Sequence, residues 1–385
     1  MSIIKTILKI ILGLIIGMSI GLLIAGIGIA LFTDMSFTGY LTKLKSTEFN
    51  DGIIAMAFGI VSFMISLMLL ITIHEAGHLV CGLISGYRFV SFRIMNLTFI
   101  RTEGKIRLKQ FSVAGTGGQC LLSPPDMPLE QIPVILYNAG GVLANITVLA
   151  VTIPMLWFTD SPLALEFAVI FILTDIVLIL MNGIPLQANG IGNDAYNILL
   201  LRKNMESKRG MVFELRSNAL IQEGIRPKDM PAEWFEIPEH PDYANALEVS
   251  LPLMKASRLI DMKSWDEAHS VLDILYSHRN CIMPLFVKEI ACELVFTSLL
   301  TGHIDQAQEL LDSNLEKYIQ AYRKVMSAKE RTQCAISLYI NHDYPKALSI
   351  YNDLVEKQNR YLLQGEVKSD IDLMHYMLQA AQSDK

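Results

Sequence analysis

One segment of the 385-residue chain has residue types and spacing that could do chemistry: His74, Glu75 and His78, in the order His-Glu-x-x-His. Residues four apart lie on one face of an α-helix, about 6 Å apart along its axis, so both imidazoles can reach one metal ion. Glu75 lies beside them, where its carboxylate can take a proton from a metal-bound water. This pattern predicts zinc-dependent peptide hydrolysis, with Glu75 as the catalytic residue and His74 and His78 as zinc ligands.

A chance match is the alternative interpretation, because only three positions of the pattern are fixed. However, the segment directly follows an uncharged run over residues 52–73, and no other histidine occurs before His240. Histidine and glutamate in or near hydrocarbon are costly and are rarely kept without a role. These observations favour a metal site over coincidence.

A catalytic zinc site needs a third protein ligand and one open position. The acidic candidates are Asp175, within an apolar stretch, and Asp194, in the loop that follows it. If that loop folds back, Asp194 reaches the depth of the histidines, whereas Asp175 lies deeper and could instead hydrogen-bond a polar group on a neighbouring helix. The sequence therefore favours Asp194. Cys81 is interpreted as a small structural residue, because a fourth ligand would close the open position.

Two asparagines are weaker candidates, for substrate binding. Asn145 shares a helical face with Asn138 and Gly141, a pattern that more often marks a seam between packed helices. Asn182 precedes a break at Pro185, where capping of the helix end is an equally good interpretation.

The helices that carry these residues are predicted to cross a lipid bilayer. Of all residues, 52% are hydrophobic and 18% are charged, whereas soluble domains carry about 25% charged residues. Apolar runs long enough for a helical span cover residues 10–33, 52–73, 131–159 and about 163–181. The first run could be a signal peptide, but it exceeds the usual ~7–15 apolar residues, so a retained anchor is favoured.

The distribution of charge predicts the orientation of the chain. The loop over residues 82–130 carries six Lys and Arg residues, whereas the turn near Asp160 has none. By the positive-inside tendency, this loop, the N-terminus and the C-terminal half face the cytoplasm of a plasma membrane. The five cysteines show no paired spacing, which fits reduced thiols. No basic cluster offers a phosphate-binding surface, so nucleic acid is not an expected partner.

Within this loop, apolar and polar residues alternate in the two runs Val90–Ile94 and Ile106–Lys109. Thr102-Glu103-Gly104-Lys105 lies between the runs, so the pattern predicts a cytoplasmic β-hairpin. Residues 115–125, rich in Gly and Pro, are predicted to be irregular.

The charged residues divide unevenly, with 23 in residues 1–204 and 47 in residues 205–385, where acidic residues are in excess. This asymmetry predicts a boundary near residue 205 between a membrane part and a mildly acidic soluble part.

The soluble part is predicted to contain repeats after a polar, proline-containing connector. A short pattern ends at Ala268 and recurs at Ala307 and Ala347, with apolar helical patterns on both sides. It resembles tetratricopeptide repeats, with a period longer than their usual ~34 residues. An all-α helical-repeat domain that binds a cytoplasmic protein partner is expected, and an unrelated α-helical domain is the alternative.

Together these features resemble the site-2 protease family of intramembrane zinc metalloproteases, over about residues 50–200. His74-Glu75-Ala76-Gly77-His78 is similar to the family's catalytic helix. Asn182-Gly183-Ile184-Pro185 followed by Asp194 is similar to its Asn-x-x-Pro…Asp-Gly motif, with Ala195 in place of the last glycine. Gly140-Gly141-Val142-Leu143-Ala144-Asn145 is similar to the family's intervening helix. The resemblance implies one zinc ion, Asp194 as its third ligand, and a β-hairpin that presents substrate in extended form.

We therefore expect an α-helical integral membrane protein of about four transmembrane helices, a cytoplasmic β-hairpin and a C-terminal repeat domain. The expected parts are an anchor and outer loop (1–50), a zinc metalloprotease core (51–204), a connector (205–240) and the repeats (241–385). The expected function is intramembrane hydrolysis of transmembrane segments or remnant signal peptides. The alternative is a non-proteolytic zinc-binding membrane scaffold whose repeats bind a protein partner.

Overall fold

The structure is a computed structural model. It describes residues 49–383 apart from residues 103, 111–116, 159–160 and 189, together with a few isolated positions before residue 49. The span expected over residues 10–33 therefore lies outside the described residues. The chain divides into two compact units, Met1–His74 with Leu143–Leu180, and Glu75–Val142 with Met181–Lys385.

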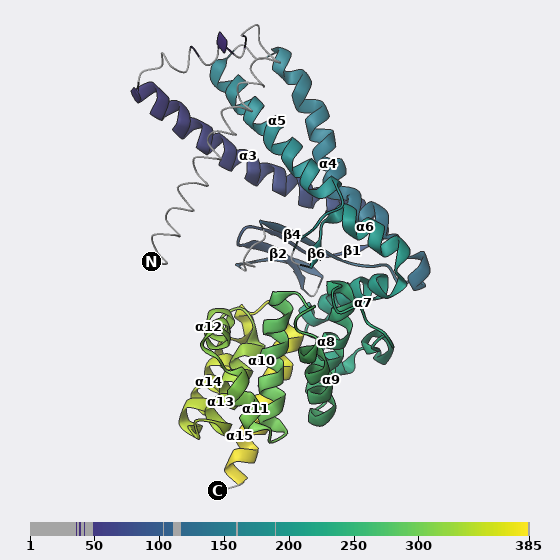
Figure 1. The fold of residues 1–385 in the computed structure, drawn as a ribbon, viewed down its shortest axis with the longest axis vertical. Coiled ribbons are helices and arrows are strands. Elements are labelled where there is room, and N and C mark those ends of the chain that lie inside the picture. The colour runs from purple at the N-terminus through teal and green to yellow at the C-terminus, as the bar shows by residue number, and fades with distance from the viewer. Residues whose placement is uncertain are drawn as a thin grey trace. The chain divides into compact units, whose positions relative to one another are not determined.

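Three helices in the described part of the chain are long and apolar enough to cross a membrane (Figure 1): α3 (Phe49–Ile84), α4 (Val134–Met155) and α5 (Pro162–Gly183). They coincide with the second, third and fourth predicted spans. Large apolar side chains are exposed on or beside them, including Ile54 at 67%, Val151 at 60% and Phe158 at 86%. Exposed apolar surface of this extent is typical of contact with lipid, so these helices are compatible with a membrane location.

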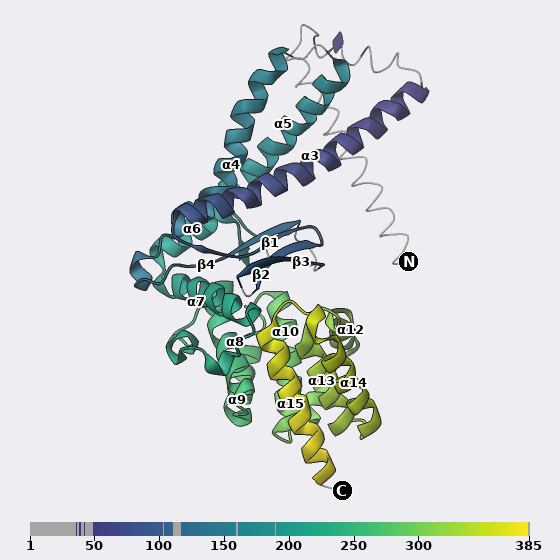
Figure 2. The same cartoon turned by 180° about the vertical axis from the view of Figure 1, so that it is seen from behind.

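The second unit contains a four-stranded antiparallel sheet in the order β3-β2-β1-β4 (Figure 2). Its strands are β1 (Arg88–Ile94), β2 (Leu97–Thr102), β3 (Lys105–Gln110) and β4 (Gly118–Ser123).

The pairing predicted for the hairpin is wrong, because the two predicted runs are not neighbours. In the described part of the chain, β1 pairs with β2 and β4, and β3 pairs with β2 alone. A tight turn at Met95, with a φ of 53°, reverses the chain between β1 and β2. Methionine rarely adopts this left-handed conformation, so residue 95 gave no signal of a turn. Residues 118–123, predicted to be irregular, form strand β4.

The segment expected to be a connector begins with a helix, α7 (Met205–Gln222), which follows α6 (Asp194–Lys203) after the single residue Asn204. The Asn204 side chain accepts a hydrogen bond from the Ser207 amide at 3.0 Å, which caps α7. Gln222 at the end of α7 donates to the Val90 carbonyl of β1 at 3.0 Å. Two 3-10 turns follow, η3 (Pro227–Asp229) and η4 (Ala232–Phe235).

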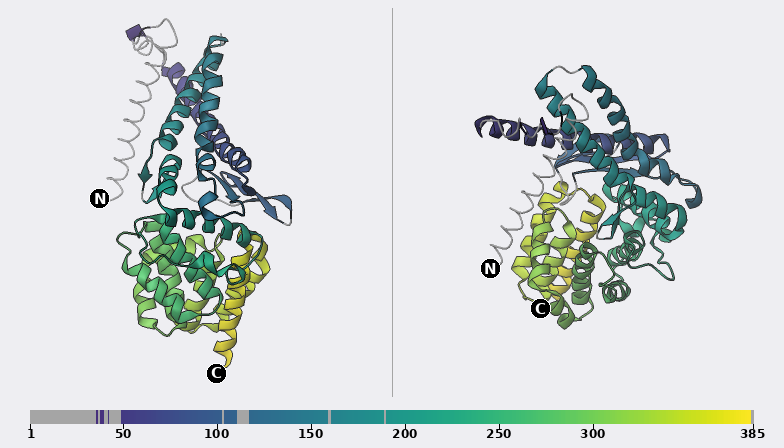
Figure 3. Two further views of the ribbon diagram at one scale, coloured as in Figure 1. Left: turned by 90° about the vertical axis from the view of Figure 1, so that its right-hand side faces the viewer. Right: turned by 45° about the horizontal axis from the view of Figure 1, so that its top comes forward.

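The rest of the second unit is an array of helices that share one hydrophobic core (Figures 1 and 3). The helices are α8 (Ala246–Asp261), α9 (Trp265–Ser277), α10 (Pro284–Leu300), α11 (Ile304–Leu310), α12 (Ser313–Tyr322), α13 (Ser327–Tyr339), α14 (Tyr344–Lys357) and α15 (Gln364–Ser383). α9 packs on α10, α10 packs on α13, and α13 packs on both α14 and α15.

The three recurring sequence segments form short turns in three helical pairs, α8–α9, α10–α11 and α13–α14. One residue in each turn has a positive φ: Lys263 at 62°, Gly302 at 82° and His342 at 51°. The alanine five residues later is fully buried in each pair (Ala268, Ala307 and Ala347). A small side chain lets the paired helices approach closely, so the sequence repeat is a structural repeat.

Candidate metal centre

His74, Glu75 and His78 lie on one uninterrupted stretch of α3, so the helix itself places the two imidazoles one turn apart. One ligand atom each from His74, His78 and Asp194 lies within 4.8 Å of the others. Asp194 Oδ2 is 3.4 Å from His78 Nε2. Among the described residues, this is the group of His, Cys, Asp or Glu side chains that could hold a metal ion. Two imidazoles and a carboxylate form a donor set that suits catalytic zinc.

The His78 ring is oriented by a backbone carbonyl on α4. His78 Nδ1 lies 2.8 Å from the Tyr137 carbonyl oxygen, which can only accept a hydrogen bond, so Nδ1 carries the proton. In the neutral ring, Nε2 then presents a lone pair towards the Asp194 carboxylate. Two acceptors at 3.4 Å need a proton or a cation between them. The arrangement therefore fits a bound metal cation.

The His74 ring is oriented by a chain of two hydrogen bonds. Asn145 Nδ2 donates to Asp175 Oδ1 at 2.6 Å, which turns Asn145 Oδ1 towards His74 Nδ1 at 2.8 Å. Nδ1 therefore carries the proton and Nε2 is the nitrogen that can bind a metal. Partners of this kind fix the tautomer and orientation of metal-binding histidines.

These two hydrogen bonds bear on Asp175 and Asn145, whose roles the sequence left open. Asp175 lies outside the ligand group and bonds a polar group on a neighbouring helix, as its depth suggested. Asn145 is fully buried, and its amide is engaged at both ends. That geometry favours a positioning role for Asn145 over contact with substrate.

Asp194 is placed by its neighbour Asn193, which sequence reasoning missed. The Asn193 side chain donates to the Met181 and Ile184 carbonyls at the end of α5, at 2.5 and 2.6 Å. Its oxygen accepts from the amides of Leu186 at 3.1 Å and Tyr196 at 2.9 Å. One side chain thus joins the end of α5 to the start of α6. Asparagine before a run of helix-forming residues is an N-cap signal, and it could have identified this residue.

The loop between α5 and α6 contains secondary structure of its own. It contains the two-stranded ladder β5 (Gln187–Ala188) with β6 (Ile191–Gly192), and Asp194 is the first residue of α6. Ala195 is therefore the second residue of a helix, where alanine is favourable and a glycine is not needed.

Two glycines bring the backbones of α3 and α4 together beside His78. A Cβ atom built on Gly140 would lie 2.4 Å from the Gly77 carbonyl oxygen and 2.9 Å from Cys81 Cβ. A side chain at Gly140 would separate the helices, and it would move the Tyr137 carbonyl away from His78. Cys81 accordingly packs as a small side chain.

Gly140→Ala should therefore destabilise the protein by about 1–3 kcal/mol, the usual cost of overpacking. It should also lower the fraction of chains that retain zinc. The matched control is Gly183→Ala, whose Cβ would meet Val142 Cγ1 at an ordinary 3.5 Å. Thermal unfolding and metal content of the purified proteins in detergent check both expectations. Equal effects of the two substitutions would contradict a special role for the Gly140 contact.

The remaining candidates are Glu75 and Asn182, both partly buried. Glu75 lies within electrostatic reach of Arg93 on β1, a buried side chain that donates to the Met95 and Gly118 carbonyls. Burial lowers the pKa of the Arg93 guanidinium, and the charge of Glu75 opposes that change. Asn182 lies in the last turn of α5 and is not one of the ligand group.

No protein-family model, curated protein sequence or solved structure matches this chain.

Proposed function

We propose that the protein is a zinc-dependent intramembrane endopeptidase of the kind that the site-2 protease resemblance implies. The proposal rests on one observation. One ligand atom each from His74, His78 and Asp194 lies within 4.8 Å of the others, on and beside a helix apolar enough to cross a membrane. His78 Nε2 and Asp194 Oδ2 face each other as two acceptors, which a cation between them would satisfy.

Each polar residue has a defined task in the proposed reaction. His74, His78 and Asp194 would hold zinc, which supplies a Lewis acid that polarises the scissile carbonyl and acidifies a water. Glu75 accepts the proton of the attacking water and delivers it to the leaving amine. Asn145 and the Tyr137 carbonyl hold the two imidazole rings in the required orientation.

The proposed substrates are transmembrane segments or remnant signal peptides, bound in extended form. Among the described residues, strand β3 lies at an edge of the sheet and pairs with β2 alone. Its outward apolar side chains, Ile106 at 67% and Leu108 at 58%, are exposed. An exposed edge can add an extended peptide as a further strand, which makes β3 the candidate surface for substrate. The N-terminus and the helical array are proposed to face the cytoplasm of a plasma membrane.

Removal of the metal tests this proposal. Full-length protein in detergent is incubated with tagged transmembrane peptides, before and after treatment with a zinc chelator and after zinc is restored. Cleavage should stop on chelation and return with zinc, because the attacking water loses its activation. Membrane-retained peptides that accumulate in cells without the protein supply the candidate substrates.

Two outcomes would contradict the proposal. Cleavage that continues without metal would exclude the zinc chemistry. Fully zinc-loaded protein that cleaves none of the accumulating peptides would favour the non-proteolytic scaffold.

A further inference from the structure

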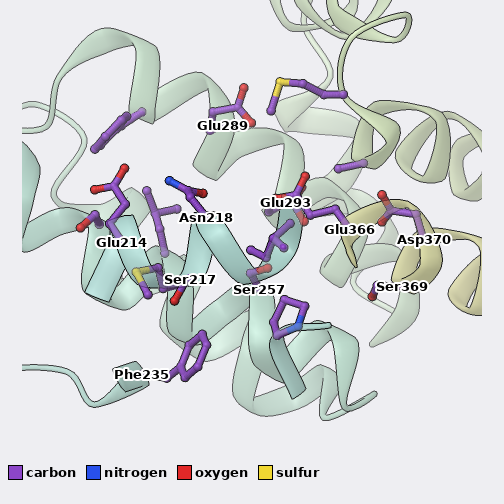
Figure 4. Close-up of a pocket in the computed structure, with 18 of the residues that line it drawn as sticks. Glu214, Ser217, Asn218, Phe235, Ser257, Glu289, Glu293, Glu366, Ser369 and Asp370 are labelled. Carbon is purple, nitrogen blue, oxygen red and sulfur yellow. The ribbon is translucent and has the colours of Figure 1, made fainter. Parts of the chain in front are cut away.

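A cavity of about 330 Å³ lies within the helical part of the second unit (Figure 4). Its walls come from α7, η3, η4, α8, α10, α13 and α15, and it includes none of the proposed metal ligands. Part of the wall is apolar, including Phe235, Leu253 and Phe286. Five carboxylates also line it, from Glu214, Glu289, Glu293, Glu366 and Asp370.

The cations of the described residues neutralise only some of these carboxylates. Arg331 bonds Asp370 at 2.9 Å and also pairs with Glu293. The fully buried Lys329 pairs with Glu289 at 2.6 Å. In the described part of the chain, neither Glu214 nor Glu366 has an ion-pair partner. Two cations thus pair with three of the five carboxylates that line the cavity.

A second feature of the wall points to a ligand. Ser217 is only 3% exposed, and its Oγ has no hydrogen-bond partner among the described residues. Leaving a buried hydroxyl unsatisfied is costly, so native structures usually provide a partner. Figure 4 shows Asn218, from the same turn of α7, lying between Glu214 and Glu293. Polar groups from a bound molecule would complete this wall.

The pKa values of three carboxyl groups in the wall are raised, as expected where buried carboxylates outnumber cations. Burial and the nearby carboxylates of Asp370, Glu293 and Glu289 together raise the pKa of Glu366 to about 8, although Arg331 opposes them. Burial likewise raises the pKa of Asp370 to about 6. Burial also raises the pKa of Glu214, although the hydrogen bond with the Ser250 hydroxyl lowers it in part. A cation placed among these groups would stabilise their ionised forms.

We propose that the cavity binds a lysine or arginine side chain of a partner polypeptide. Such a side chain has an apolar stem for Phe235, Leu253 and Phe286, and a charged head for Glu214 and Glu366. The volume is near the lower end of the ~300–1,000 Å³ of small-molecule pockets, which suits one long side chain. Arrays of helical pairs commonly bind polypeptides, so the head group belongs to a peptide. The proposal does not depend on proteolysis.

The test measures binding to the full-length protein in detergent by fluorescence anisotropy. The probe is a labelled eight-residue peptide, capped at both ends, with one arginine among alanine and leucine. In a second probe, citrulline replaces arginine, which keeps the shape and removes the charge. The arginine peptide should bind at least tenfold more tightly at pH 8. Its affinity should rise between pH 6 and pH 9, because Glu366 must lose a proton to pair with the guanidinium.

The variants locate the site. Glu366→Gln on α15 and Glu214→Gln on α7 should each weaken the arginine peptide at least tenfold and leave the citrulline peptide unchanged. Glu356→Gln, on the exposed surface of α14, is the matched control and should change neither. Because the two test residues lie on different helices, misfolding of one variant still leaves the other informative. Unfolding curves identify such a case.

Three outcomes would overturn the proposal. The first is equal binding of the arginine and citrulline peptides. The second is equal loss of affinity in Glu356→Gln and in the two cavity variants. The third is complete displacement of the labelled peptide by a single capped arginine at the same concentration as the peptide. That result would show that the cavity binds a small cation rather than a polypeptide.

Discussion

Replacing Glu75 with glutamine should lower the rate of peptide-bond cleavage by roughly 10³-fold, within the range of general acid–base catalysis. Glutamine has nearly the same shape as glutamate but cannot accept a proton from water. Glu75 is not one of the three side chains that form the candidate ligand group. The variant should therefore retain one zinc ion per chain and unfold at a similar temperature.

The measurement pairs the cleavage rate with metal content on the same preparation. Glu309→Gln is the matched control, because Glu309 is exposed on α11, outside the proposed site. Loss of both zinc and cleavage in Glu75→Gln would indicate a structural role for Glu75. Cleavage at the wild-type rate with zinc bound would exclude Glu75 as the base.

The part of the site that the sequence could predict is the part carried by a single helix. His74 and His78 are four residues apart, so their common face follows from helix geometry alone. Asp194 required one further step, the return of a loop from the end of α5. The sequence indicated the break at Pro185, and the structure places the loop as a small β-ladder followed by α6.

The partners of the ligands were harder to predict, because they depend on packing between helices. The Tyr137 carbonyl has no sequence signal, since every residue has a backbone carbonyl. Its contact with His78 exists because Gly77 and Gly140 let two backbones meet. The role of Asn145 likewise depends on Asp175, thirty residues away, which occupies the other end of its amide.

Packing between distant segments also explains where the rest of the second unit differs from the structure that the sequence predicted. The polar composition of residues 205–240 predicted a connector, yet Lys208 is buried and donates to the Glu130 carbonyl at 2.9 Å. Pairing with distant backbone groups compensates for burial of such residues, and composition does not reveal it. The acidic cavity also joins Glu214 to Glu366, which no local pattern connects.

Replacing Asp194 with asparagine should weaken zinc binding far more than replacing Asp175 with asparagine. Asp194 contributes one of the three ligand atoms, whereas Asp175 lies outside this group and accepts a hydrogen bond from Asn145. Loss of a residue that orients a ligand by a hydrogen bond typically lowers metal affinity by roughly 10–100-fold. Loss of a ligand itself should lower the affinity by more. Competition with a chromophoric zinc chelator measures both affinities. A larger loss in Asp175→Asn would make Asp175 the ligand and exclude the assignment of Asp194.

A double variant tests whether Asp175 acts on His74 through Asn145 or whether the two residues act independently. If Asp175 orients His74 only through Asn145, then Asn145→Ala removes the effect of both residues. Adding Asp175→Asn to Asn145→Ala should then lower zinc affinity no further, so the two changes are strongly non-additive. Additive losses at Asn145 and Asp175 would mean that the two side chains act on the metal separately, against the hydrogen-bond chain to His74.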